Sequence, residues 1–159
     1  MSDLDKKYIQ LAIEQARESV KQGGFPAGAI VVKDDVIIGR GISIGNKRND
    51  PTSHGEMEAI RDACRKINAS DLSGATLYTS MQPCIMCFGA TMWSSIGRVM
   101  FACSKEKVSD EYYGGHYIIA DVNQQINRSI KIEHLKEFEE ESLKVVGEWE
   151  MQSIFKFVE

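Results

Sequence analysis

Residues 75–95 read ATLYTSMQPCIMCFGATMWSS, and this stretch sets the expected fold. Residues 75–79 predict a short buried strand. Pro83 is typical of the first turn of a helix, and the apolar residues after it predict a helix that runs to about Ser95. A strand that leads directly into a helix is the repeating unit of an α/β sheet, so we expect a layered α/β protein.

The segments on either side continue this alternation of strands and helices. Apolar residues at steps of three and four predict a first helix over residues 4–20, with Ser2 and Asp5 as a capping pair. The other expected elements are strands at 27–32, 36–41, 98–102 and 129–132, helices at 56–67 and 135–159, and a polar loop at 46–53. The sequence therefore predicts an α/β fold, a three-layer α/β/α sandwich around a five-stranded mixed sheet.

The composition is that of one ordinary globular domain, which we expect to span residues 1–159. The chain has 159 residues, 43% of them apolar, and a formal net charge of −4. No apolar run approaches the roughly 18 residues of a membrane-spanning helix, and the polar start at residues 1–7 does not resemble a secretory signal. We therefore expect a cytoplasmic protein with no membrane partner. The acidic balance weighs against nucleic acid as a partner, although Lys47-Arg48 leaves a local basic patch open.

Two of the four cysteines are placed to bind a metal ion. Cys84 and Cys87 are three residues apart, so on a helix they share one face and can close on one ion. His54, at the start of the preceding predicted helix, supplies a third ligand. Three protein ligands leave one coordination position for water, which is the pattern of a catalytic zinc ion. Glu56 lies two residues after His54 and can reach that water as a proton shuttle. Taken alone, the two cysteines also fit a thiol oxidoreductase, which would form a reducible disulfide and bind no metal.

Four blocks of sequence resemble the cytidine deaminase-like superfamily of zinc deaminases, and they occur in the order expected for it. The blocks are residues 25–32 (FPAGAIVV), 50–56 (DPTSHGE), 77–80 (LYTS) and 83–87 (PCIMC). Within the superfamily, the chain is similar to the branch of cytosine, guanine and tRNA adenosine deaminases. The resemblance implies that His54, Cys84 and Cys87 bind one Zn²⁺ per chain. It also implies that Glu56 transfers protons from water to the substrate and to the leaving ammonia.

The resemblance implies substrate contacts as well. It places Asn46 at the substrate-binding asparagine of the family, and Ala27 and Ser80 beside the substrate. The interval from Asn46 to His54 is three residues shorter than is usual in the family, so Asn49 is an alternative. Ala27 stands where guanine deaminases tend to carry an aromatic residue.

We expect zinc-dependent hydrolytic deamination of a free nucleobase or nucleoside, leaning to a guanine-type purine, with water as the second substrate. Deamination of cytosine or cytidine, or of adenosine in tRNA, is the alternative within the superfamily. A non-catalytic zinc-binding module is the alternative of a different class. The resemblance further implies a homodimer, in which residues 149–159 cover the active site of their own chain or of a partner chain.

The remaining cysteine, histidine and aromatic residues near these motifs are expected to have no catalytic role. The ones interpreted as core residues are Cys64, Cys103, Phe88 and Trp93. His116, between glycine and tyrosine, is interpreted as structural or exposed. Asp121 is interpreted as exposed, with a substrate contact as the alternative.

Overall fold

The computed structural model describes the backbone of residues 1–156 and the side chains of residues 1–154. Within that part of the chain, five strands form one sheet in the order β2-β1-β3-β4-β5. The strands are β1 Phe25–Lys33, β2 Val36–Ser43, β3 Thr76–Met81, β4 Arg98–Cys103 and β5 Lys131–His134. β1 pairs antiparallel with both β2 and β3, whereas β4 pairs parallel with both β3 and β5. The predicted five-stranded mixed sheet is confirmed.

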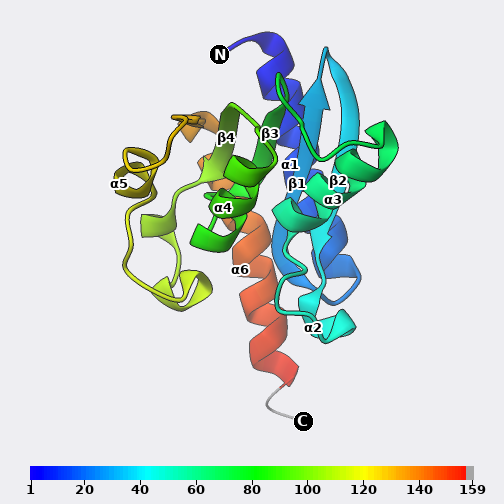
Figure 1. Ribbon diagram of the computed structural model, residues 1–159. Coiled ribbons are helices and arrows are strands. Elements are labelled where there is room, and N and C mark those ends of the chain that lie inside the picture. Colours follow the sequence, from blue (N-terminus) through cyan, green and yellow to red (C-terminus); the bar gives the residue numbers. More distant parts are fainter. Residues whose placement is uncertain (157–159) are drawn as a thin grey trace.

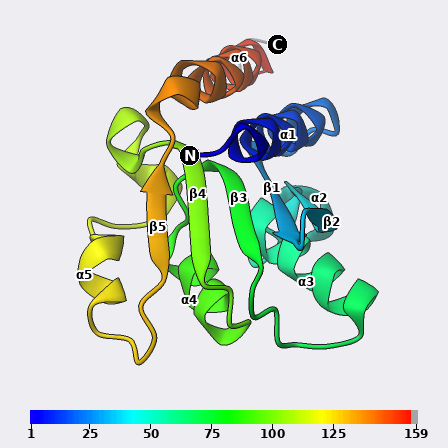
Figure 2. The ribbon, with the colours of Figure 1, turned by 90° about the horizontal axis from the view of Figure 1, so that it is seen from above.

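Helices cover both faces of the sheet, as the sequence predicts (Figures 1 and 2). The helices are α1 Asp3–Lys21, α2 Gly45–Arg48, α3 Gly55–Ile67, α4 Ile85–Trp93, α5 Ile119–Asn123 and α6 Glu139–Lys156. Figure 2 shows α1 and α6 on one face, α3 and α4 on the other, and α5 beside β5. No described helix combines the length and apolar character that crossing a membrane requires.

The central strand β1 is buried on both faces, and its side chains alternate between two cores. Ile30 and Val32 pack with α1 and α6, whereas Ala29 and Val31 pack with α3 and α4. This period of two is the geometry of an extended strand, and apolar residues at every position are typical of a strand covered on both sides. The three-layer sandwich therefore follows from a continuous apolar run in the sequence.

Local signals set most element ends, with three differences from the predictions. The Ser2–Asp5 capping box forms as expected. The predicted polar loop contains the short helix α2, which ends where Asn49 adopts a left-handed conformation. Pro83 precedes α4 instead of lying in its first turn, because Cys84 is the N-cap. Trp93 was expected in the core, but it is the last residue of α4 and 83% of its surface is exposed. Phe88, on the same helix, is buried as predicted.

The parallel part of the sheet determines where a site can form. β3 and β4 run in the same direction, and α4 begins shortly after the carboxyl end of β3. Ligands of open α/β sheets bind outside the carboxyl ends of the strands, where the chain turns into the following helices. The zinc-binding motif of the sequence lies at this end.

Candidate metal centre and active-site cavity

His54 is held by a rigid polar loop at the start of α3. It is the N-cap residue of that helix and has an extended backbone conformation. In the loop before it, the Asp50 carboxylate accepts hydrogen bonds from the Thr52 amide (2.8 Å) and hydroxyl (2.7 Å). The Ser53 hydroxyl donates to Glu58 (3.0 Å), which is also paired with Arg61 (2.7 Å). These bonds fix the position from which the imidazole projects.

The glycine between His54 and Glu56 is required by packing. A Cβ atom on Gly55 would lie 2.9 Å from the Cα of Gly28 and one on Gly28 would lie 2.3 Å from the backbone nitrogen of Ala16. The two glycines therefore allow the start of α3 and the helix α1 to approach β1 from opposite faces. Gly55 is explained by this contact.

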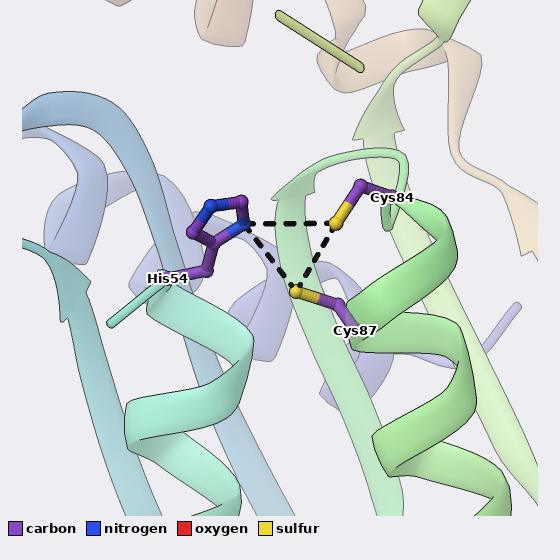
Figure 3. Close-up of side chains that lie close together, drawn as sticks. All are labelled: His54, Cys84 and Cys87. Atoms are coloured by element: carbon purple, nitrogen blue, oxygen red, sulfur yellow. Dashed lines mark hydrogen bonds between the residues drawn. The ribbon is translucent and has the colours of Figure 1, made fainter. Parts of the chain in front are cut away.

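The three expected metal ligands converge on one point (Figure 3). Nδ1 of His54 lies 3.6 Å from Sγ of Cys84 and 3.6 Å from Sγ of Cys87, and the two sulfur atoms are 3.6 Å apart. Zinc binds sulfur at about 2.3 Å and nitrogen at about 2.0–2.1 Å, so tetrahedral geometry separates such ligand atoms by roughly 3.5–3.8 Å. The donor atoms therefore already have the spacing of a tetrahedral zinc site with one position left open.

Cys84 and Cys87 are coupled in a way that favours a thiolate. The hydrogen bond from Cys87 lowers the pKa of Cys84 to about 4, with a further contribution from His54. The same interaction raises the pKa of Cys87. The thiolate is the form of cysteine that binds a metal ion. The lowered pKa of Cys84 therefore means that this thiol of the pair is deprotonated at neutral pH.

Glu56 lies beside this cluster without being part of the ligand set. It is almost fully buried, and burial, followed by the negative charge of Cys84, raises its pKa to about 7. No lysine or arginine of the described residues pairs with it. A buried carboxyl group with a pKa near neutrality can both accept and donate a proton at physiological pH.

The cluster lies in a cavity of about 430 Å³, within the usual size range of small-molecule sites. His54, Glu56 and Cys84 line one side of it. The aromatic residues of the wall come from three distant segments, and they are Phe25, Tyr112, Tyr113 and Trp149. Phe25, Tyr112 and Trp149 pack edge to face with centroid distances of 5.1–6.0 Å. The cavity therefore has a reactive side and an aromatic side suited to a planar ring.

Lys105 holds the segment that carries the two tyrosines. Its side chain is buried, donates to the carbonyl oxygens of Gly115 and Tyr117, and lies 4.3 Å from the centre of the Tyr117 ring. The Tyr117 hydroxyl donates to Tyr113 and accepts the amide N–H of Ile85 (3.0 Å each). One buried cation thus connects the aromatic wall to the first turn of the metal-binding helix.

The structure brings some of the expected substrate contacts to the cavity and not others. Ala27 and Asn46 line it. Asn49 does not, and Ser80 lies beneath it, fully buried, with its carbonyl accepting the hydroxyl of Ser142 (2.6 Å). The residue three positions before Asn46 is Ser43, the last residue of β2, which also lines the cavity. Ser43 is therefore a further candidate for the substrate contact that the resemblance places at Asn46.

Other residues singled out from the sequence stay away from the cavity. His116 is exposed beside Asp110, and Asp121 is exposed on α5. Cys103 is fully buried and Cys64 partly so.

In the C-terminal segment, Trp149 lines the cavity of its own chain, while Met151 and Ile154 are exposed. The side chain of Phe155 and all of Val158 lie outside the described residues.

The sequence reasoning missed most of the cavity wall. Tyr112 and Tyr113 belong to a segment that stands out as glycine-rich and aromatic, so a signal for them existed. Phe25 begins one of the four sequence blocks. Trp149 lies in the segment 149–159 that was expected to cover an active site, and the packing of α6 places it in the cavity of its own chain.

Comparisons with known proteins agree with this site. Residues 2–103 match the family described as the cytidine and deoxycytidylate deaminase zinc-binding region. A tRNA-specific adenosine deaminase of Aquifex aeolicus (strain VF5) is 38% identical over 100 residues, which are 63% of this chain and 66% of that protein, a little under two thirds of its length. A guanine deaminase of Bacillus subtilis (strain 168) is 36% identical over 117 residues, 73% of this chain and 75% of that protein. A solved structure from a study of A-to-I editing by tRNA:A34 deaminases has a TM-score of 0.76 and 26% identity, covering 88% of this chain and 99% of its own.

The chain therefore belongs to the family of the cytidine and deoxycytidylate deaminase zinc-binding region, and its fold is that of the cytidine deaminase-like deaminases. It is a member of the zinc-dependent hydrolytic deaminases, as the resemblance implied, and His54, Cys84 and Cys87 form the candidate zinc site. The two named relatives are of similar identity and carry different substrates in their names, so the family does not by itself specify the substrate.

Proposed function

We propose that this protein hydrolytically deaminates a free nucleobase or nucleoside with a guanine-type purine ring. The observation that carries the proposal is the placement of Glu56, buried and unpaired with any cation, beside three converging zinc ligands in a cavity with an aromatic wall. In the reaction, water adds to the ring carbon that bears the amino group. The carbon–nitrogen bond then breaks, ammonia leaves, and a carbonyl oxygen derived from water remains.

The residues divide this work between them. His54, Cys84 and Cys87 would hold the zinc ion, which lowers the pKa of water to about 7 when three protein ligands bind it. Glu56 accepts one proton from water and passes it to the adjacent ring nitrogen. It then accepts the second proton, from the hydroxyl added to the ring carbon, and gives it to the leaving nitrogen, so ammonia departs as the carbonyl forms. The aromatic side of the cavity orients the ring and excludes bulk water, so each transfer occurs over a short distance.

The charges around the cavity support a small substrate over tRNA. The charged residues that line it, apart from His54, are the acidic Asp50 and Glu56, and Glu150 hydrogen-bonds Tyr112 in the aromatic wall (2.6 Å). Arg48, part of the basic patch noted in the sequence, pairs with Glu58 (2.9 Å). Binding of a nucleic-acid backbone depends on cations that neutralise phosphates, and this rim offers mainly carboxylates. The lean to a guanine-type ring draws on the match to the guanine deaminase of Bacillus subtilis, which is 36% identical over 73% of this chain.

Deamination of adenosine in tRNA is the second candidate, because the Aquifex enzyme is of similar identity to this chain and the structure from the study of tRNA:A34 deaminases has the same fold. Zinc-loaded protein incubated with guanine, guanosine, cytosine, cytidine, adenine and tRNA, with ammonia or inosine measured, decides between them. Preferential release of ammonia from guanine or guanosine is the expected result. Release from tRNA alone would contradict the proposal, and full zinc content with no product from any substrate would indicate a non-catalytic zinc module.

A homodimer and a cytoplasmic location complete the proposal. Ile85 and Trp93 expose large apolar side chains on α4, and such surfaces are typical of protein interfaces. All four cysteines are unpaired, as in a reducing compartment. Sedimentation at several protein concentrations tests the dimer: Trp93→Ala should shift the equilibrium toward monomer.

A further inference from the structure

The wall of the cavity formed by the end of β2, α2 and the Asp50 loop carries polar side chains, unlike the aromatic part of the cavity. The polar residues of this wall that line the cavity are Ser43, Asn46, Asp50 and Ser53. The Ser53 hydroxyl already donates to Glu58 (3.0 Å), which leaves the other three to contact a ligand. Their backbones are tied together and to the neighbouring elements: the Asp50 amide donates to the carbonyl oxygen of Gly45 (3.1 Å), at the start of α2. The wall is therefore a preformed surface, and it faces a cavity whose other walls carry the metal ligands and the aromatic rings.

Ser43 is the most informative of the three. It is only 6% exposed, and its backbone is fixed because the hydroxyl of Ser19 accepts its amide N–H and donates to its carbonyl oxygen (3.0 Å each). Its own hydroxyl has no hydrogen-bond partner among the described residues, and it is not sealed off in the interior. This hydroxyl is therefore available as a donor or an acceptor to a ligand in the cavity.

The other two residues present acceptors. The side-chain amide nitrogen of Asn46 donates to the carbonyl oxygen of Gly23 (2.8 Å), which leaves its oxygen as the free group. One carboxylate oxygen of Asp50 accepts both hydrogen bonds from Thr52, and the other has no partner in the described part of the chain. The hydrogen bonds from Thr52 hold the pKa of Asp50 below its usual value, so the group is ionised at neutral pH.

Two acceptors and a hydroxyl select a ligand that brings hydrogen-bond donors and no negative charge. A ribose offers hydroxyl donors, and a carboxylate that binds ribose hydroxyls is a recurring device of nucleotide-binding folds. A phosphate offers no donor at neutral pH and is repelled by the carboxylate. With the reacting carbon at the metal ligands and the ring beside the aromatic wall, the polar wall is the side left for the sugar.

We propose that Ser43, Asn46 and Asp50 form a ribose subsite, and that the substrate is an unphosphorylated nucleoside. This inference rests on the proposed deaminase function and narrows it: the free base would bind without using this wall, and the nucleotide would be excluded by it. The competing explanation is that the same side chains accept hydrogen bonds from an amino group or a ring N–H of the base itself.

The test compares one purine in four forms: guanine, guanosine, 2′-deoxyguanosine and guanosine 5′-monophosphate. We expect kcat/KM for guanosine to exceed that for guanine and for the monophosphate by about tenfold or more, which corresponds to about 1.4 kcal/mol and is within the contribution of one hydrogen bond to a charged group. Ser43→Ala and Asp50→Asn should each remove most of the advantage of guanosine over guanine, and Asp50→Asn should also raise activity on the monophosphate. Equal losses on guanine and guanosine would overturn the ribose subsite and favour base recognition.

The chain provides a matched control for Asp50→Asn. Asp71 accepts hydrogen bonds from the amide and hydroxyl of Ser73 in a turn of the same form as that of Asp50 and Thr52, but it does not line the cavity. In both turns asparagine keeps the accepting oxygen and removes only the charge. Asp71→Asn should leave the ratio of guanosine to guanine activity unchanged, and an equal change in both variants would overturn the inference.

A binding measurement separates failure of the subsite from failure of the proposed function. Zinc-loaded Glu56→Gln protein should bind guanosine without converting it, and calorimetry should give a Kd for guanosine about tenfold below that for guanine. Tighter binding of guanosine by this protein, with no turnover of any purine by the unmodified enzyme, would support the subsite and contradict the deaminase function. Equal Kd values, with turnover of guanine, would contradict the subsite alone.

Discussion

Two clusters of titratable groups lie toward opposite ends of β3 and β4, and they differ in how their charges are satisfied. At the amino end, Asp5 accepts hydrogen bonds from Arg98 (2.9 and 3.2 Å), Tyr78 (2.7 Å) and Ser2 (2.8 Å). Burial alone would raise the pKa of Asp5, but these partners hold it well below its usual range. At the carboxyl end, Glu56 has no such partner, and its pKa is raised.

The difference separates a structural cluster from a functional one. Every charge in the Asp5 cluster has an opposite charge and good hydrogen bonds, which is the condition for a buried ion pair to persist. In the other cluster, burial and the negative charge of Cys84 raise the pKa of Glu56, and the hydrogen bond with Cys84 raises the pKa of Cys87. Such arrangements lower stability and are found where a protein binds metal or moves protons.

The largest expected effect is on the rate of the Glu56→Gln variant. Loss of the proton shuttle should lower kcat by about 10²–10⁴-fold with nearly unchanged zinc content, because general acid–base catalysis contributes a factor of that size. Ammonia release and metal analysis on the same sample measure this. Unchanged turnover would mean that another group carries the protons.

Asp5→Ala should have the opposite pattern. Arg98 keeps Glu133 as a partner (2.6 Å), but the buried hydroxyl of Tyr78 loses its acceptor, so the free energy of unfolding should fall by about 1–3 kcal/mol, as measured by urea denaturation. Activity per folded molecule should stay the same. Asp3→Ala is the control, since Asp3 is exposed in the same helical turn and should cost less than about 1 kcal/mol. Equal losses in both variants would show that the ion pair is unimportant.

The two clusters should respond to pH with opposite sign in the metal-free protein. The folded-state pKa of Asp5 is depressed, so its contribution is present above the unfolded value of about 3.9 and is lost as pH falls further. The folded-state pKa of Glu56 is raised to about 7, so stability is lost as pH rises from its unfolded value toward 7. The stability advantage of Glu56→Gln over the unmodified protein should therefore grow between about pH 4.5 and 7. A constant difference over this range would show that Glu56 has an ordinary pKa in the folded state.

The smallest expected effect comes from Lys105, a third buried charge that has only carbonyl oxygens and aromatic rings as partners. Lys105→Met should loosen the wall that carries Tyr112 and Tyr113 and raise KM several-fold, up to about tenfold, with kcat little changed. Steady-state kinetics measure the split between the two constants. Lys107→Met, an exposed neighbour, is the control and should change neither constant. A fall in kcat alone would place the effect at the metal-binding helix instead.

The sequence by itself determined the layers of the fold and the shared helix face of Cys84 and Cys87, because both depend on short-range periodicity. An apolar run such as residues 27–32 fits only a strand covered on both faces, and Cys84 and Cys87 share a helix face by their spacing alone. The position of Glu56 two residues after His54 likewise fixed its place beside the metal ligands. These features needed no knowledge of which segments meet.

Only the tertiary structure decided the walls of the cavity. Ser80 is adjacent in sequence to the cysteine motif but turns into the interior, whereas Trp149 is far from it and lines the cavity. Ser43 faces the cavity because the Ser19 hydroxyl holds the end of β2 against α1. Contacts between distant segments depend on how helices pack on a sheet, and local spacing carries no record of that packing. The chemistry was therefore encoded locally, and the shape that selects the substrate arises from the fold.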